Sequence, residues 1–359
     1  MGDYANEPNS IFAGVHHPAP WDDIRDSITN VIIENAVTHI GEDAFIYCTR
    51  LTSVTIPGNV ASIGHRAFYK CTALGSVTIE EGVDSIGAAA FYSCTALVSV
   101  IIPSSLLFIG RATFKGCKNL TSVTIPGSLT SVGEEAFAYC EHLASITVAT
   151  DNAHHSSEDG VLFDKNKTIL QQYPQRKRGT SYTIPSTVTS IDVLAFQYGC
   201  ADLTSLTIPG SITSIGWLVF QYCKGLESVT IGDGVTSIGM RAFVSSGLKS
   251  VTIPNSVDTI AEYAFALCTG ITSVEIGVSV TSIKQAAFWG CKSLTSITSL
   301  NPIPPDLEHV PPYLGYMPFE GIPPNACLNV PANSLAAYRA AKGWRDFKCV
   351  NPLAAAPGG

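Results

Sequence analysis

A phenylalanine that returns every 22 to 24 residues constrains the fold of this chain more than any other feature. The series comprises Phe45, Phe68, Phe91, Phe114 and Phe137 and, after an interruption, Phe196, Phe220, Phe243, Phe265 and Phe288. A fixed period of this length is typical of repeat proteins, in which each unit packs only against its neighbours. The series therefore predicts a solenoid in place of several globular domains.

The first half of each repeat has the pattern of a β-strand. In one of the clearest units Val123 and Ile125 alternate with Ser122 and Thr124, and Pro126 follows. Alternation with a period of two, in β-branched residues, is typical of a half-buried strand. Proline ends the strand because it cannot donate a ladder hydrogen bond.

The second half of the repeat has a different spacing. Val132, Ala136, Phe137 and Cys140 are separated by four, one and three residues, which favours a short α-helical or 3-10 segment against the same core. The sequence thus predicts an α/β repeat solenoid. We expect an arc with a parallel β-sheet on its concave face and short helical or 3-10 segments on its convex face.

The repeats resemble a known family. The units LTSVTIPGSLTSVGEEAFAYC (120–140) and GLESVTIGDGVTSIGMRAF (225–243) are similar to BspA-type, or Treponema-type, leucine-rich repeats of bacterial surface proteins. The resemblance extends from about Ile28 to Phe347, and both ends of the chain resemble the family's usual opening and closing segments. It implies a leucine-rich-repeat fold, a role in adhesion or host-protein binding, and a place at the cell surface or in secretion.

Four parts are expected along the chain. They are an N-terminal opening segment (1–27), repeats of about 23 residues (28–299), a proline-rich closing segment (300–350) and a linker or tail (351–359). A hairpin-bearing enlarged coil interrupts the repeats at about 149–180, where two apolar stretches flank a polar turn. Such an insertion either projects from the solenoid as part of a binding face or is a structural irregularity.

Cysteine recurs with the repeat. Nine of the eleven cysteines follow the repeated phenylalanine by three or four residues, and Ser246 fills the tenth position. Stacked coils would align these thiols in a column of small buried residues, although disulfides between coils are geometrically conceivable. No pair has the Cys-x₂₋₄-Cys spacing that zinc sites typically use.

Little in the sequence indicates catalysis or metal binding. No phosphate-binding loop, nucleophile elbow or metalloprotease motif occurs, and the carboxylates change identity between repeats. His154 lies near Asp151, Glu158 and Asp159 in the interruption, which leaves a weak cation site open beside the simpler interpretation of a polar loop. We predict no enzymatic activity, no cofactor and no metal site.

Charge and hydropathy exclude two further classes of partner. The formal net charge of -8 argues against nucleic acid, since binding it needs clustered Lys and Arg. The one basic run, Arg176–Arg178, is short and isolated. No stretch of 18 or more apolar residues occurs, so no membrane insertion is expected. The N-terminus lacks the pattern of a signal peptide.

The solvent side of the strands supplies the candidate site. Ser and Thr occupy the outward positions in most repeats, so stacking would align them as two hydroxyl ladders. The candidate partner-binding residues are Ser99, Ile101, Ser122, Thr124, Ser145, Thr147, Ser205, Thr207, Ser228, Thr230, Thr252 and Glu275. Ile101 and Glu275 break the ladders.

Three interpretations of these ladders stay open. Small hydroxyl residues could simply suit a curved parallel sheet, or they could form an uncharged platform for a protein or glycan. A crystalline surface such as ice is a third ligand, but it requires a flat array. We predict a monomeric, non-enzymatic protein-binding or adhesion module that recognises a host or matrix protein. The alternative is a structural stalk or intracellular scaffold with no ligand on this face.

Overall fold

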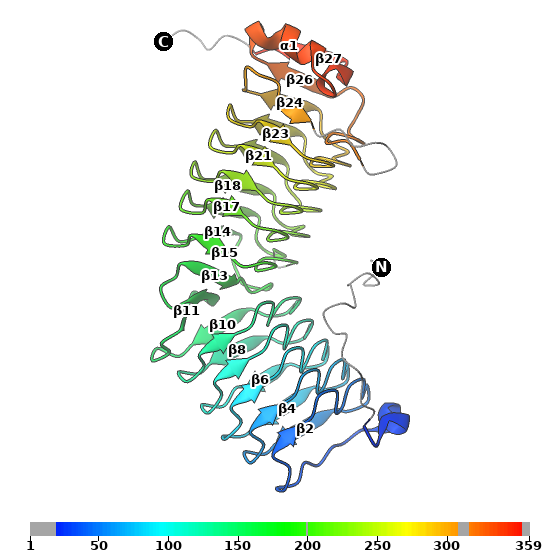
Figure 1. Ribbon diagram of the computed structural model, residues 1–359, viewed down its shortest axis with the longest axis vertical. Helices are drawn as coiled ribbons and strands as arrows, with labels where there is room; N and C mark the ends of the chain where they lie inside the picture. Colours follow the sequence, from blue (N-terminus) through cyan, green and yellow to red (C-terminus); the bar gives the residue numbers. More distant parts are fainter. Residues whose placement is uncertain (1–18, 199, 308–315, 354–359) are drawn as a thin grey trace.

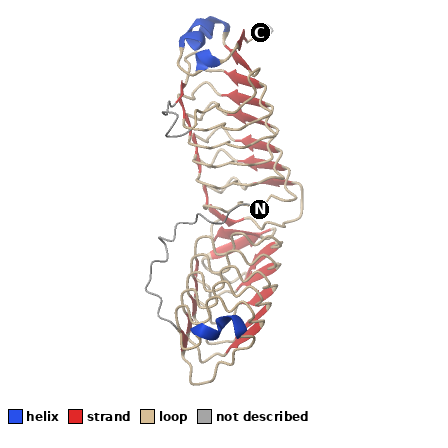
Figure 2. Cartoon of the chain, turned by 90° about the vertical axis from the view of Figure 1, so that its right-hand side faces the viewer, coloured by secondary structure: helices blue, strands red, loops and turns tan. Residues whose placement is uncertain are grey.

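The structure is a computed structural model that describes residues 19–198, 200–307 and 316–353. Its architecture is a parallel-strand β-solenoid of about 13 turns. Two stacks of coils lie end to end, one on each side of the interruption (Figures 1 and 2). The first 18 residues and the last six lie outside the described residues.

Each coil contributes a long strand to one face of the solenoid. The long strands are β2 (Ser53–Ile56), β4 (Ser76–Ile79), β6 (Ser99–Ile101), β8 (Ser122–Ile125), β10 (Ser145–Val148), β14 (Ser181–Thr183), β16 (Ser205–Ile208), β18 (Ser228–Ile231), β20 (Ser250–Ile253), β22 (Ser273–Ile276), β24 (Ser296–Ser299), β26 (Cys327–Val330) and β27 (Cys349–Pro352). They form three sheets, β2 to β10, β14 to β18 and β20 to β27, within which the strands pair in parallel and in register, Ser against Ser and Val against Val, as in β2 and β4. The strand that the period-two pattern predicts is therefore confirmed.

A second, shorter strand follows a corner of the coil. These strands are β1 (His39–Ile40), β3 (Ser62–Ile63), β5 (Ser85–Ile86), β7 (Phe108–Ile109), β9 (Ser131–Val132), β15 (Ser190–Ile191), β17 (Ser214–Ile215), β19 (Ser237–Ile238), β21 (Thr259–Ile260), β23 (Ser282–Ile283) and β25 (Asp306–Leu307). They form their own parallel ladders. Val132, which we had placed at the start of a helical segment, thus lies in a strand.

The expected helical or 3-10 segments are absent from the described repeats, and that prediction is wrong. Each coil closes through a turn segment that contains the phenylalanine. Arg66 and Lys70 flank Phe68 there with positive φ angles of 52° and 56°. The Phe68 amide donates to Ala90 of the next coil at 2.7 Å.

The reason lies in the spacing of the coils. An α-helix is about 10 Å across, whereas paired strands are about 4.8 Å apart, so a helix on every coil would splay the stack. The turn segment instead alternates local and inter-coil hydrogen bonds. Adjacent coils are therefore about one strand spacing apart along the long strands, the short strands and the turn segments. Because the spacing is similar on all sides, we expect little curvature within a stack.

The phenylalanines form a continuous column inside each stack, as their spacing predicts. Between Phe68 and Phe137 the ring centroids of successive coils are 5.3 to 5.7 Å apart, and the ring planes differ by only 1° or 2°. From Phe243 to Phe319 the ring planes of successive phenylalanines likewise differ by only 3° to 5°. The rings of these coils are therefore stacked nearly face to face, whereas those of Phe196 and Phe220, at the start of the second stack, are tilted by 46°.

The interruption is built into the solenoid. β11 (His155–Glu158), β12 (Val161–Asp164) and β13 (Ile169–Gln172) form an antiparallel meander, and β13 then pairs in parallel with β15. In β12, Leu162 packs into the core of the first stack, whereas Val161 and Phe163 pack into the core of the second. Of the two alternatives for this insertion, the burial of β12 on both of its faces favours the structural irregularity over a projecting hairpin.

The C-terminal segment closes the second stack. It contains the 3-10 turns η3 (Ala332–Ser334) and η4 (Trp344–Asp346) and the helix α1 (Leu335–Ala340). Trp344 is fully buried and its indole Nε1 donates to the Pro305 carbonyl at 2.7 Å. Strand β27 includes Asn351 and Pro352, which we had assigned to a linker or tail. At the other end, a 3-10 turn η2 (Asp22–Ser27) follows Trp21, which stacks on Phe45.

A disulfide joins Cys327 and Cys349 within this closing segment, whereas the other nine cysteines are buried and free. The spacing of the cysteines in the sequence does not by itself predict this pair. Their separation of 22 residues equals one repeat, so they occupy facing positions of β26 and β27.

Removing a ring from the middle of the phenylalanine column should destabilise the first stack. Phe114 is fully buried and stacks on Phe91 and Phe137. We expect Phe114→Ala to lower the free energy of unfolding by about 3–5 kcal/mol, because it removes a large side chain and leaves a cavity. Urea denaturation followed by circular dichroism measures this. Phe108→Ala is the matched control, since Phe108 is 43% exposed; equal losses in both variants would contradict the column's role.

Breaking the disulfide should destabilise the C-terminal end. The bond constrains a loop of 22 residues in the unfolded chain. We expect Cys327→Ser with Cys349→Ser to cost about 3 kcal/mol, measured by chemical denaturation. Dithiothreitol should destabilise the wild type and leave this double variant unchanged. A comparable effect of the reductant on both proteins would show that another bond is involved.

Candidate functional site

The long-strand face presents the residues that the sequence analysis selected. Ser99, Ile101, Ser122, Thr124, Thr147, Ser228, Thr230, Thr252 and Glu275 are exposed, and Ser145, Ser205 and Thr207 are half-buried. Val123 and Ile125, which alternate with them in β8, are buried. The hydroxyl side chains therefore point outward, as the alternation predicts.

The hydroxyl groups of the ladders differ from those of the threonines that precede them in the coil. Thr121 and Thr272, one residue before a ladder serine, donate to carbonyls of the preceding coil at 3.4 and 3.2 Å. Among the candidate serines and threonines in the described residues, only Ser228 donates a hydrogen bond to the protein, to the Thr204 carbonyl at 3.5 Å. The other candidate hydroxyls donate no hydrogen bond to the described residues, whereas Ser296, further along the serine ladder, accepts one from Asn329 Nδ2 at 3.2 Å.

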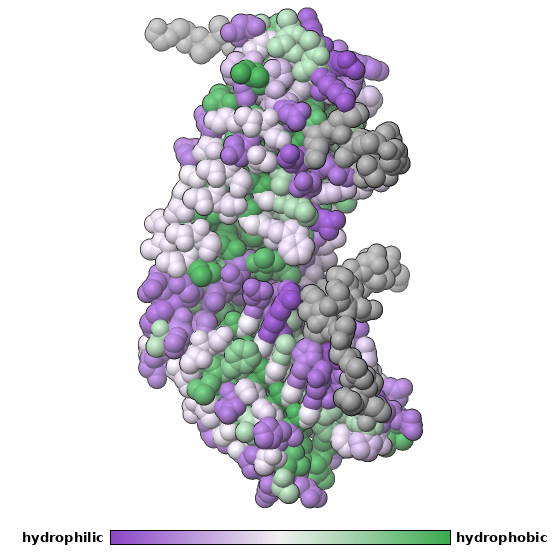
Figure 3. Space-filling view, in the orientation of Figure 1, coloured by the Kyte–Doolittle hydropathy of each residue, from purple (hydrophilic) through white to green (hydrophobic). Residues whose placement is uncertain are grey.

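The candidate residues form two surfaces. β2 to β10 make one ladder, but the next long strand, β14, belongs to a separate sheet. The meander lies between them, and the Ile146 amide donates to Gly160 at 2.9 Å. In the view of Figure 3 hydrophilic side chains gather at the level of β11, while the upper stack is paler.

One coil departs from the others in a way that the sequence analysis only partly detected. Ile101 is 72% exposed, and Val98, Leu107 and Phe108 of the same coil are also exposed. Facing positions on adjacent coils carry Thr or Ser, such as Thr78 for Ile101 and Ser85 or Ser131 for Phe108. A comparison of equivalent positions across the repeats would have revealed all four residues.

The cysteine column is unsuited to nucleophilic chemistry. Burial raises the pKa of Cys48 to about 11 and that of Cys140 to about 12, so the thiols stay protonated. Cys94 Sγ donates to the Phe68 carbonyl of the preceding coil at 3.2 Å. These thiols fill space and satisfy carbonyls between coils.

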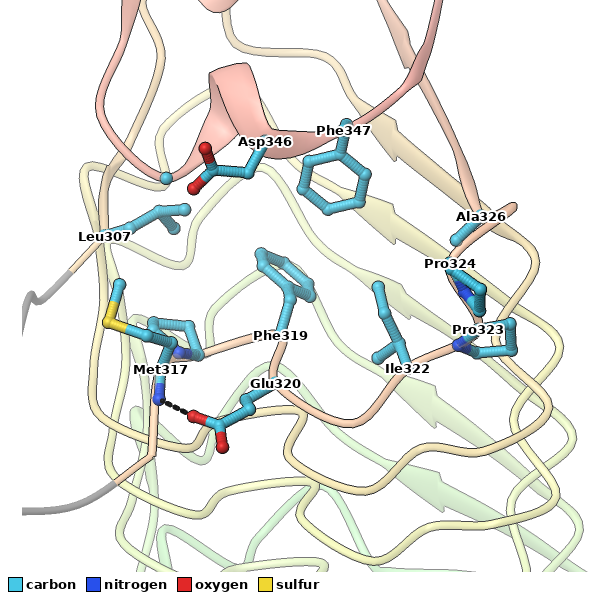
Figure 4. A pocket seen from close by; sticks show the side chains of 12 residues that line it. Leu307, Met317, Phe319, Glu320, Ile322, Pro323, Pro324, Ala326, Asp346 and Phe347 are labelled. Carbon is cyan, nitrogen blue, oxygen red and sulfur yellow. Dashed lines mark hydrogen bonds between the residues drawn. The ribbon is translucent and has the colours of Figure 1, made fainter. Parts of the chain in front are cut away.

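Two cavities lie at the ends of the described solenoid, and both are lined largely by apolar side chains. A cavity of about 240 Å³ lies in the closing segment, where the rings of Phe319 and Phe347 meet edge to face with centroids 5.7 Å apart (Figure 4). The Glu320 carboxylate beside it accepts from the Met317 amide at 3.0 Å. An apolar cavity of about 520 Å³ at the first coil is lined by residues such as Trp21 and Ile33.

The described residues contain no group of three or more His, Cys, Asp and Glu side chains that could hold a metal ion. The cluster that we considered around His154 is therefore not formed. No helix in the described part of the chain has the length and apolar character needed to span a bilayer.

The repeats, the parallel sheets and the surface define a leucine-rich-repeat solenoid, a class whose members are generally non-enzymatic and bind proteins. The profile of the BspA type Leucine rich repeat region matches residues 24–156 and 189–305. The chain belongs to this family, whose members are typically found at the cell surface. No curated protein matches the sequence.

Solved structures agree with this assignment. A leucine-rich repeat protein from Eubacterium ventriosum is 28% identical, with a TM-score of 0.66, and the match covers 84% of this chain and 85% of that one. A leucine-rich cell surface protein from Faecalibacterium prausnitzii is 30% identical, with a TM-score of 0.52 and coverages of 73% and 83%. The pneumococcal vaccine antigen PcpA shares the fold at 20% identity, with a TM-score of 0.63 and coverages of 89% and 71%.

The junction between the stacks should make stability depend on pH. Burial, together with the nearby carboxylates of Glu134 and Asp164, raises the pKa of Asp192 to about 6. The folded state therefore binds this proton more tightly than the unfolded chain, and stability falls as the pH rises from about 4 to about 6. Because the carboxyl is only partly buried, solvent screening reduces the effect to on the order of 1 kcal/mol.

We expect Asp192→Asn to stabilise the protein at pH 7.5, with a smaller gain at pH 4.5. Thermal denaturation at both pH values measures this, with the exposed Asp258→Asn as the control. A gain independent of pH would contradict the assignment of the effect to this carboxyl.

Proposed function

We propose that this chain is a non-enzymatic protein-binding or adhesion module that recognises a host or matrix protein through its long-strand face. The unused hydrogen-bonding capacity of the ladder hydroxyls carries the proposal. The threonine one position before a ladder serine, such as Thr121, instead donates its hydroxyl to the preceding coil, so the ladder hydroxyls are the ones left available to a partner.

The surface has the composition of a recognition site. It combines uncharged hydroxyl groups with isolated apolar side chains, of which Ile101 is the most exposed. Interfaces place apolar anchors at their centre and exclude water around them. Ile101 and Val98 would supply such an anchor on the first stack, and Glu275 the charged contact on the second.

The location that we propose is the cell surface or the extracellular medium. The family supports it, and so does the disulfide between Cys327 and Cys349, since disulfides persist in oxidising compartments. We propose that the module acts as a monomer.

Arginines placed on the ladders should block binding. We expect the triple variant Thr124→Arg, Thr147→Arg and Thr207→Arg to weaken binding at least about tenfold, because bulky charges replace hydroxyls in the contact surface. Immobilised fibronectin, laminin and collagen are the protein probes, and a glycan array tests the alternative ligand class.

The matched control places three arginines beside the short strands, at the exposed residues Thr130, Thr189 and Thr236. Equal affinities of the two triple variants would move the site away from the long-strand face. Failure of the wild type to bind any probe would favour the alternative, a structural stalk or scaffold.

A further inference from the structure

Apolar side chains also gather on the turn side of the solenoid, away from the long strands. Each turn segment begins with a residue that follows the end of the short strand by two positions. In the first stack this position holds Glu42, His65, Ala88, Arg111 and Glu134, and in the second it holds Val193, Trp217, Met240, Glu262 and Gln285. Three adjacent coils thus carry apolar residues where the others carry mainly polar ones.

The three side chains are exposed. Val193 is 38% exposed, Trp217 49% and Met240 43%, whereas the residues that follow the first two, Leu194 and Leu218, are buried. Folding therefore gains little from the apolar character of this position, and Ala88 shows that the repeat accepts a small residue there. Exposed apolar patches of this kind mark interaction sites.

Val193, Trp217 and Met240 lie on three successive coils, and we name them the tryptophan patch. β17 and β19 pair through Ser214 and Ser237, and the Leu218 amide donates to the Met240 carbonyl at 3.3 Å. β15 and β17 belong to separate sheets, but the Phe196 amide donates to the Val219 carbonyl at 3.2 Å and joins the coil of Val193 to that of Trp217. Equivalent positions in stacked coils are separated by one strand spacing, about 4.8 Å. The patch therefore offers one apolar side chain per coil along the solenoid axis.

Carboxylates border the patch at both ends. Glu134 lies beyond Val193 and lines the same small cleft as Asp192, and Glu262 occupies the equivalent position on the coil after Met240. No ion pair joins Glu134 or Glu262 to another described residue. The neighbouring Arg241 lies over the ring of Tyr263, 5.4 Å from its centroid. The border is thus acidic and complementary to a cationic partner.

We propose that the tryptophan patch binds an amphipathic helix of a partner protein, with one apolar residue per turn and Lys or Arg at both ends. A helix rises about 5.4 Å per turn, which nearly matches the strand spacing, so apolar residues at i, i+4 and i+7 would meet Val193, Trp217 and Met240 in turn. The basic ends of the helix would pair with Glu134 and Glu262. This site lies apart from the hydroxyl ladders and does not depend on them.

A synthetic peptide tests the proposal on the whole chain. The probe is a helical peptide of about 15 residues with a Leu stripe and Lys at both ends. Calorimetry should show binding by the wild type, and emission from Trp217 should shift to shorter wavelength. The same peptide with Glu in place of Lys should not bind, and a scrambled peptide should bind at least about tenfold more weakly.

Variants then locate the site. Trp217→Ala with Met240→Ala should weaken peptide binding at least about tenfold, since both replacements reproduce the residue at Ala88. Glu134→Gln with Glu262→Gln should weaken it several-fold and reduce its dependence on salt. Val278→Ala, which alters another exposed apolar side chain, should have no effect. The three ladder arginines should also leave peptide binding unchanged, which separates this site from the long-strand face.

Three outcomes would overturn the proposal. The first is an absence of peptide binding, or binding that Trp217→Ala with Met240→Ala does not weaken. The second is a dimer in analytical ultracentrifugation that this double variant abolishes, because the occupant would then be a second copy of the chain. The third is binding to phosphatidylcholine vesicles that requires Trp217, since the occupant would then be a lipid surface.

Discussion

The inter-coil hydrogen bond at strand spacing is the interaction on which the rest of this structure depends. It joins the long strands, the short strands and the turn segments, so each coil contacts the next at about the same distance on every side. This spacing excludes helices from the repeats and keeps the coils parallel. Phe68, Phe91 and Phe114 can then stack with nearly coplanar orientations.

Parallel coils also determine the character of the surface. Every outward position is repeated along the axis, so equivalent residues form a continuous column on the surface. The residues that differ from the rest of their column are the candidates for binding a partner. Ile101 interrupts the threonine ladder, and Trp217 interrupts a polar column on the turn side. Since neither side chain is buried by the fold, each is better explained by an external contact than by packing.

The interruption separates the long-strand faces of the two stacks, but the hydrophobic cores of the stacks remain in contact. β12 supplies Leu162 to one core and Phe163 to the other, and Tyr173 takes the place of a phenylalanine by stacking on Phe196 at 4.7 Å. The two stacks are therefore joined through packed side chains, while the hydroxyl ladders of the first stack are separated from those of the second. A ligand that contacts the ladders of both stacks would have to cross the meander.

The sequence by itself determined the solenoid, the long strand and the outward direction of Ser122 and Thr124, because period and alternation are local properties of a chain. It could not determine the conformation around Phe137, since the spacing of apolar residues is the same for a helix and for a turn that bonds to the next coil. Nor could it place Leu162 and Phe163 in different cores, or pair Cys327 with Cys349. Those features were decided by tertiary structure, because each depends on the distance to a neighbouring coil, which no residue specifies alone.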